Sequence, residues 1–197
     1  MMIFNLNSFR GALALILIFL SSSIVHAQGV NTQKITFRDI ELGVDGVKEK
    51  IAEICKEDKA NTRDKEKTCN LEKDRELMWL TYGNLQHTLA WVSIGKNGSL
   101  EQVEFNGEAT VSLLGLAELL SEKYGKPHKE TTSVSNRIGN KFDKHTFTWI
   151  DKKGNAIIID SLHEKVGEGR ALILSGERLK AMNIINKVIT ESQKSKL

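Results

Sequence analysis

Cys55 and Cys69 are the two cysteines of the chain, and the spacing between them indicates which chemistry they perform. Thirteen residues separate them, whereas redox-active pairs usually have the Cys-x-x-Cys spacing, in which one thiol can attack the other's mixed disulfide. In an oxidising compartment, an even pair this close in sequence predicts a structural disulfide. Closing a loop of about 15 residues stabilises a fold by roughly 3 kcal/mol in the chain-entropy model.

Histidines could act as metal ligands, but their spacing does not predict a zinc site. The chain has no HExxH sequence and no Cys–His cluster. Gly43 and Gly46 also lack the further glycine and the phosphate-loop context of a nucleotide site. We therefore expect no metal and no cofactor. The histidines that follow residue 27 are all more than five residues apart: His87, His128, His145 and His163.

Two pairs of ionisable residues are candidates for acid–base catalysis. Asp160 and His163 are close in sequence, but no Gly-x-Ser-x-Gly elbow or other candidate nucleophile accompanies them. Glu101 and Glu104 could flank a glycosidic bond, although the same spacing is common among exposed charges on a strand. The sequence therefore predicts no catalytic residue.

Aromatic side chains are the remaining candidates for a functional role. Such rings are frequent at protein–protein hot spots, and they are equally frequent in cores. Trp91 and Trp149 lie inside predicted strands, where we expect them to be core residues. Trp79 and Tyr82 follow a charged segment with weak periodicity. We predict that this second pair contacts a binding partner.

The first 27 residues have the pattern of a cleavable signal peptide. Arg10 precedes an apolar run at residues 11–20, and Val25-His26-Ala27 places small or aliphatic residues three and one before a cut. A membrane-spanning helix needs about 20 apolar residues, which is more than this run provides. We expect Sec-dependent export with cleavage after Ala27, a soluble protein in the periplasm, with secretion as the alternative, and no integral membrane segment in the mature chain.

The charge of the chain does not favour a nucleic acid as partner. The formal net charge is +3 for all 197 residues, and only Arg10 is lost with residues 1–27, which leaves +2 on 170 residues. The densest charged segment, residues 56–76, has seven basic and seven acidic residues. Since polyanion binding needs clustered Lys and Arg, this neutral segment is interpreted as a solvated surface.

Residues 28–197 predict a single α+β domain with a mostly antiparallel sheet covered on one face by helices. Asn97-Gly98 predicts a tight hairpin between two strands, and Gly125 with Pro127 ends a leucine-rich helix whose broad apolar surface predicts deep burial. The segment from residue 56 to residue 79 is expected to be mostly loop. Strands are expected at residues 34–42, 87–94, 99–105, 130–137, 143–150, 156–160 and 170–174, and helices near 45–55, 111–120 and 176–192.

The stretch IELGVDGVKEKIAEIC, followed later by LAWVSIGKNGSLEQVEF, resembles the helix-then-hairpin unit of exported envelope proteins of the SmpA/OmlA (BamE-like) type. LAELLSEKYGKP, followed by HTFTWI, resembles the same unit, and two units side by side resemble β-lactamase-inhibitor-protein-like domains. The resemblance implies two similar units and a protein-binding module. This chain lacks the lipid-acceptor cysteine of the BamE-like pattern, so the resemblance does not imply outer-membrane anchoring.

These observations favour a non-catalytic periplasmic module that binds another protein, either an envelope assembly component or an enzyme that it inhibits. Two other classes stay open. One is a hydrolase whose active site assembles from residues distant in sequence, and the other is a carrier with a cavity for a small ligand. The sequence does not indicate an oligomeric state.

Overall fold

The computed structural model describes residues 33–60, 69 and 71–194, with side chains described as far as Ile185. The predicted signal peptide, residues 1–27, lies outside the described residues. No helix in the described part of the chain combines the length and the apolar character that a membrane crossing requires.

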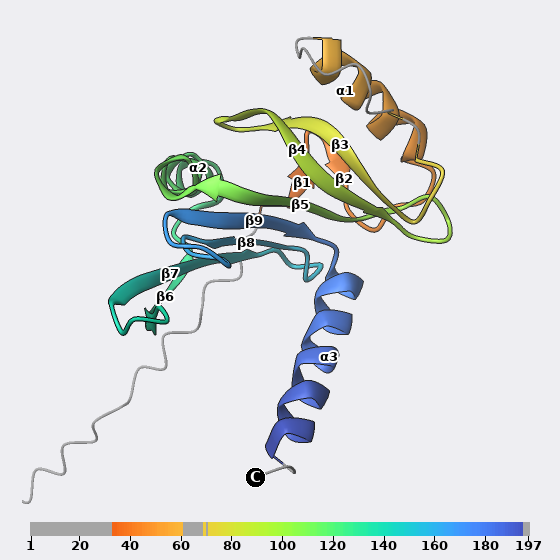
Figure 1. Ribbon diagram of the computed structural model, residues 1–197. Helices are drawn as coiled ribbons and strands as arrows, with labels where there is room; N and C mark the ends of the chain where they lie inside the picture. Colours follow the sequence, from red (N-terminus) through yellow and green to blue (C-terminus); the bar gives the residue numbers. More distant parts are fainter. Residues whose placement is uncertain (1–32, 61–68, 70, 195–197) are drawn as a thin grey trace, which may run out of the picture.

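Seven strands form one antiparallel sheet in the order β3-β4-β5-β9-β8-β7-β6 (Figure 1). Every neighbouring pair in it is antiparallel, which confirms the predicted α+β class. A separate hairpin is formed by β1 (Thr36–Phe37) and β2 (Ile40–Glu41). The seven strands are β3 (Arg75–Tyr82), β4 (Leu85–Ile94), β5 (Leu100–Ala109), β6 (His128–Ser135), β7 (Lys141–Ile150), β8 (Ala156–Asp160) and β9 (Glu168–Leu174).

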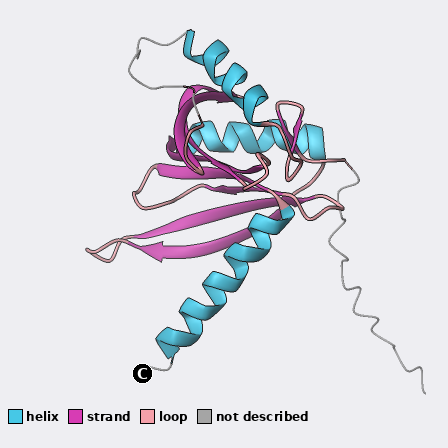
Figure 2. Cartoon of the chain, turned by 90° about the vertical axis from the view of Figure 1, so that its right-hand side faces the viewer, coloured by secondary structure: helices cyan, strands magenta, loops and turns pink. Residues whose placement is uncertain are grey.

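Three helices accompany the sheet: α1 (Lys48–Ala60), α2 (Thr110–Tyr124) and α3 (Gly176–Lys194). α2 packs against β4, β5, β8 and β9, and α1 packs against β3 and β4. α3 leaves the end of β9 on the side of the sheet opposite to α1 and α2 (Figures 1 and 2). The sequence had led us to expect all the helices on one face of the sheet. Instead, α3 lies on the other side from α1 and α2 (Figures 1 and 2).

The two faces of the sheet differ in what covers them. Residues directly opposite each other in an antiparallel ladder point to the same side, so one row of partners identifies a face. The row Met78, Ala90, Phe105 and Ala171 is fully buried in the main core, and we call this side the inner face. The side chains that alternate with these residues form the outer face.

α2 is buried along one side of the helix. Leu113, Leu116 and Leu120 are buried against the sheet, but Val111 is 77% exposed and Leu119 is exposed on the opposite side of the helix. A helix packed on a sheet buries one stripe of side chains. The buried leucines confirm the predicted burial of this helix against the sheet, whereas much of the other stripe of α2 is exposed.

Two other segments differ from expectation. The strand expected at residues 34–42 is broken by Arg38 and Asp39, which have φ values of 46° and 66° and make the turn between β1 and β2. The segment expected to be loop contributes the end of α1 and most of β3. The apolar side chains of β3 lie on both of its faces, which hides the period-two pattern that identifies a strand. By contrast, the hairpin predicted at Gly98 is present between β4 and β5.

Cys55 and Cys69 form a disulfide, as predicted from their spacing, with their Cα atoms 5.5 Å apart. Both cysteines are buried in the main core. The bond therefore fastens α1 to the segment that leads into β3, and it closes the chain across residues 56–68, most of which lie outside the described part.

Candidate functional site

Four large apolar side chains meet on the outer face of β3 and β4. Leu77 is directly opposite Trp91, and Trp79 is directly opposite Leu89, so the four form a block of two neighbouring pairs. All are only partly buried, and Trp91 is 37% exposed. We call Leu77, Trp79, Leu89 and Trp91 the aromatic patch. β-branched and aromatic residues favour strands, so the local sequence accounts for their extended backbone but not for their exposure.

Arg75 lies at one end of the aromatic patch and is held there by two interactions. Its guanidinium carbon is 4.7 Å from the centroid of the Trp91 ring, and its Nη2 is 2.9 Å from Oε2 of Glu104. Gln102 and Asn106 also donate hydrogen bonds to the Glu104 carboxylate. These contacts restrain the rotamers of Arg75 and Trp91 in the free protein. Binding a partner therefore costs less side-chain entropy at these two residues.

The same polar network reaches α3. Nε of Arg178, in the first turn of this helix, donates to Oε1 of Gln102 over 2.9 Å. Gln102 in turn donates to Glu104, so α3 is linked through two side chains to the carboxylate that holds Arg75. Leu172 and Leu174 of β9 are buried beside this network on the outer face and lie outside the main core cluster.

Trp79 contributes an unsatisfied donor to the aromatic patch. Its Nε1 is buried and has no acceptor among the described residues. A buried donor without an acceptor costs about 1–3 kcal/mol.

Tyr82 does not share a surface with Trp79, which corrects the predicted contact pair. Tyr82 is 9% exposed and belongs to the core, where its ring stacks with Phe37 at 5.5 Å and Phe105 at 6.3 Å between centroids. Burial, and then the neighbouring Tyr124, raises the pKa of Tyr82 above its ordinary value. Two residues three positions apart on a strand point to opposite faces, so β3 separates the pair.

The two tryptophans expected in the core have different environments. Trp149 is a core residue as predicted, and its Nε1 donates to the carbonyl of Gly125 over 2.8 Å. Trp91 belongs to the aromatic patch, so the prediction of a core position was wrong for it. Nothing in the local sequence distinguishes the two, since both lie in alternating strands and only the sheet pairing assigns their faces.

Asp160 is engaged with basic groups and not with His163. Its carboxylate accepts hydrogen bonds from Oγ1 of Thr146 at 2.7 Å and Nε of Arg170 at 2.8 Å, and Nζ of Lys144 is 3.2 Å away. Burial opposes its ionisation, but the Thr146 and Arg170 hydrogen bonds and the Lys144 charge outweigh burial and lower the pKa of Asp160. The carboxylate is therefore held as an anion by its neighbours.

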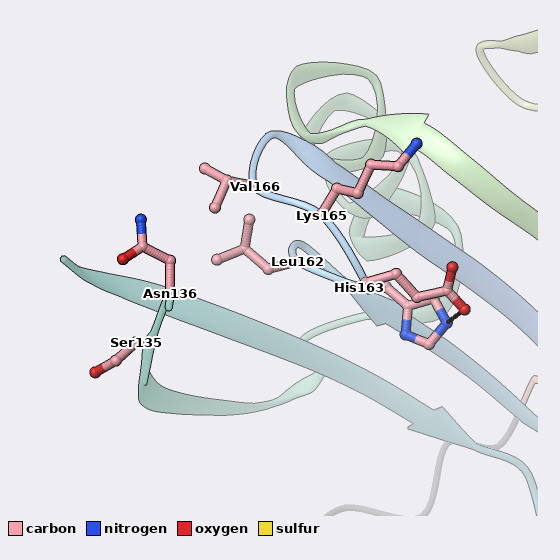
Figure 3. A pocket seen from close by; sticks show the side chains of 7 residues that line it. Ser135, Asn136, Leu162, His163, Lys165 and Val166 are labelled. Atoms are coloured by element: carbon pink, nitrogen blue, oxygen red, sulfur yellow. Dashed lines mark ion pairs between the residues drawn. The ribbon is translucent and has the colours of Figure 1, made fainter. Parts of the chain in front are cut away.

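His163 lies at a small surface hollow of about 170 Å³ between the β6–β7 turn and the β8–β9 loop (Figure 3). Ser135 and Asn136 line one side, and Leu162 lies between them and His163. Partial burial, followed by the charge of Arg170, lowers the pKa of His163. The hollow is smaller than the roughly 300 Å³ at which small-molecule pockets begin, and its polar groups do not converge on one point.

The other candidate residues do not come together. The Glu101 carboxylate lies against Gly95 in the β4–β5 turn, whereas Glu104 is held by Arg75, so the two acids do not flank a common cleft. Among residues 33–60, 69 and 71–185, no three His, Cys, Asp or Glu side chains are grouped closely enough to hold a metal ion.

Comparison with known protein families, with characterised proteins and with solved structures gives no match. The resemblance to BamE-like and β-lactamase-inhibitor-protein-like domains stays a prediction.

Proposed function

We propose that this chain is an exported periplasmic protein that binds another protein without chemical turnover, through the aromatic patch on the outer face of β3 and β4. The observation that carries the proposal is the block of four partly exposed apolar side chains with Arg75 fixed at its end. Trp and Arg are the residues most enriched at the centres of protein interfaces.

The polar surroundings of the aromatic patch support a specific partner. Strands hold Trp79 and Trp91 on a rigid scaffold, and the half-exposed Arg75 beside them is fixed by the buried network of Glu104 and Gln102. Aromatic side chains and arginine are the residue types enriched in protein–protein interfaces. The partner is either an envelope assembly component or an enzyme that this protein inhibits.

The tandem organisation that the resemblance implies belongs to the same proposal. α1 precedes three consecutive strands, β3 to β5, and α2 precedes the hairpin-linked strands β6 to β8. We infer that these are two copies of one helix-then-strands unit, in which α2 packs across the middle of the sheet, on β4, β5, β8 and β9, while α1 packs on β3 and β4.

Replacing Trp79 and Trp91 together by alanine should weaken partner capture at least tenfold, which corresponds to about 1.4 kcal/mol and lies within the range of interface hot spots. Tagged protein is incubated with native periplasmic extract, and the retained proteins are quantified by mass spectrometry. The fold should be preserved because neither ring belongs to the main core, and circular dichroism checks this.

A matched control removes apolar surface elsewhere. Val111→Ala with Leu119→Ala takes two exposed side chains from α2 and should leave capture unchanged. Equal capture by the Trp79/Trp91 variant and the native protein would refute the aromatic patch as the binding surface. If only the Val111→Ala/Leu119→Ala variant loses partner capture, the partner binds α2 and not the aromatic patch.

Export predicts that the mature protein begins at Gln28. Expressed with its own N-terminus in a Gram-negative host, the protein should appear in the soluble periplasmic fraction with an intact mass that corresponds to residues 28–197 and one disulfide. A membrane-bound species that retains residues 1–27 would contradict both the cleavage and the compartment.

A further inference from the structure

We propose that β6 pairs antiparallel with β6 of a second copy of this chain, so that the protein is a symmetric dimer with a continuous sheet. β6 is one of the two edge strands, at the opposite end of the sheet from the aromatic patch (Figure 1). An edge strand presents a row of backbone N–H and C=O groups that can pair with another strand. The proposal is independent of the proposed function.

The other edge strand, β3, is protected in the ways that proteins use to prevent pairing. α1 packs against it, and Oδ2 of Asp58 on α1 accepts a hydrogen bond from the backbone N–H of Thr81 over 2.8 Å. The ladder between β3 and β4 also shifts register between Leu80 and Tyr82. A covered edge and an irregular strand both oppose strand addition.

β6 has none of these protections in the described structure. It pairs with β7 at eight consecutive positions without a register shift, and all eight of its residues are exposed. Thr131 to Ser135 contain no charge and no proline. A lysine often guards an edge, but Nζ of Lys129 lies 5.3 Å from the ring centroid of Phe147 and so leans over the chain's own sheet. A long, regular edge with an uncharged stretch of five residues is suited to pairing.

Charge and symmetry favour a second copy as the occupant. When two β6 strands pair antiparallel about Thr132, Thr132 faces Thr132 of the second copy. Thr131 then faces Ser133, and Glu130 faces Val134. Lys129 then faces Ser135, so no like charges oppose each other. Thr and Ser also form favourable cross-strand pairs.

Closure is the second argument for a copy of this chain. A two-fold pair of β6 strands covers both unprotected edges at once, because the contact is isologous. The combined sheet then ends on both sides at a β3 edge that α1 protects. Assembly therefore stops at two copies, and each dimer carries an aromatic patch at either end. Six strand spacings separate β3 from β6, which is about 29 Å at the usual 4.8 Å per strand.

Sedimentation velocity on the mature, disulfide-bonded protein, from about 1 to 200 μM, tests the proposal. We expect a dimer that dissociates on dilution. Thr131→Lys with Ser133→Lys places like charges opposite each other in the β6–β6 register centred on Thr132 and should raise the dimer dissociation constant at least tenfold. Hydrogen exchange should show that the β6 amides are protected in the native protein and exchange faster in the variant.

The control adds the same two charges away from β6. Gln86→Lys with Asn97→Lys changes exposed residues of β4 and the β4–β5 turn and should leave the dimer intact. A native protein that is monomeric throughout this range overturns the proposal. A dimer that survives Thr131→Lys with Ser133→Lys overturns it too, because association then uses another surface.

Discussion

Replacing Asp151 by alanine is expected to lower the free energy of unfolding by about 4 kcal/mol. The Asp151 carboxylate accepts hydrogen bonds from the backbone N–H groups of Ile35, Lys153 and Asn155 and from Nδ2 of Asn155, at 2.8 to 3.0 Å. Ile35 and Asn155 are buried, so the alanine substitution leaves their N–H donors without an acceptor. Each buried donor left unpaired costs about 1–3 kcal/mol of stability.

Asp151 has this effect because it joins segments that are far apart in the chain. It holds the residue that leads into β1 onto the β7–β8 turn, and Oδ1 of Asn155 accepts a hydrogen bond from the N–H of Gly176, where α3 begins. One carboxylate thus fixes the turn to which both β1 and α3 are attached.

Urea unfolding at pH 7, followed by circular dichroism, measures the loss. Asp143→Ala is the matched control, because Asp143 is an exposed aspartate on β7 and its removal should change stability by no more than about 0.5 kcal/mol. Equal effects of the two substitutions would show that the Asp151 hydrogen bonds contribute nothing beyond the generic change to alanine.

The second large effect is expected at Asp160. Asp160→Asn removes the anion that Arg170 and Lys144 share, and it turns an amide donor toward one of them. Breaking a buried pair by removing one partner costs about 3–5 kcal/mol. We expect about 3 kcal/mol at pH 7, because the side chains of Arg170 and Lys144 are 26% and 27% exposed and water can solvate part of their charge.

The pH dependence of this effect has a definite sign. A carboxyl whose pKa is lower in the folded protein stabilises the fold fully above its unfolded pKa of about 3.9, and this stabilisation is lost as the pH falls through the folded value. The difference in unfolding free energy between native protein and Asp160→Asn should therefore be constant from pH 7 to pH 5 and should shrink below about pH 4. A difference that stays constant down to pH 3 would contradict the lowered pKa.

Asp160→Asn also distinguishes a structural role from a catalytic one. The proposed function predicts that folded Asp160→Asn protein captures the partner as the native protein does. Asp160 ends β8, which β5 and β9 separate from the two strands of the aromatic patch. A hydrolytic activity that survives rigorous purification and disappears with Asp160→Asn or His163→Ala would favour the hydrolase class instead.

Local patterns in the sequence were sufficient to predict several parts of this fold. The cysteine spacing predicted the disulfide, Asn97-Gly98 predicted the β4–β5 hairpin, and the order of elements predicted an antiparallel α+β sheet. The disulfide and the hairpin depend on interactions within about 15 residues, namely a loop short enough to close and a turn that needs positive φ. Alternation and helical periodicity are readable for the same reason.

Tertiary pairing alone decided which side chains face outward. Alternation along β3 places Trp79 and Tyr82 on opposite faces but does not say which face is outward. The packing of the sheet leaves Trp79 on the outer face and Tyr82 in the stack with Phe37 and Phe105. Likewise, the register of β7, β8 and β9 places Asp160 beside Thr146 and Arg170, which donate hydrogen bonds to it. His163, although nearer in sequence, is not among these donors. A shift of one residue in register exchanges the two faces of a strand. The register is set by contacts between strands far apart in the chain, so the candidate site could not be read from the residues beside it.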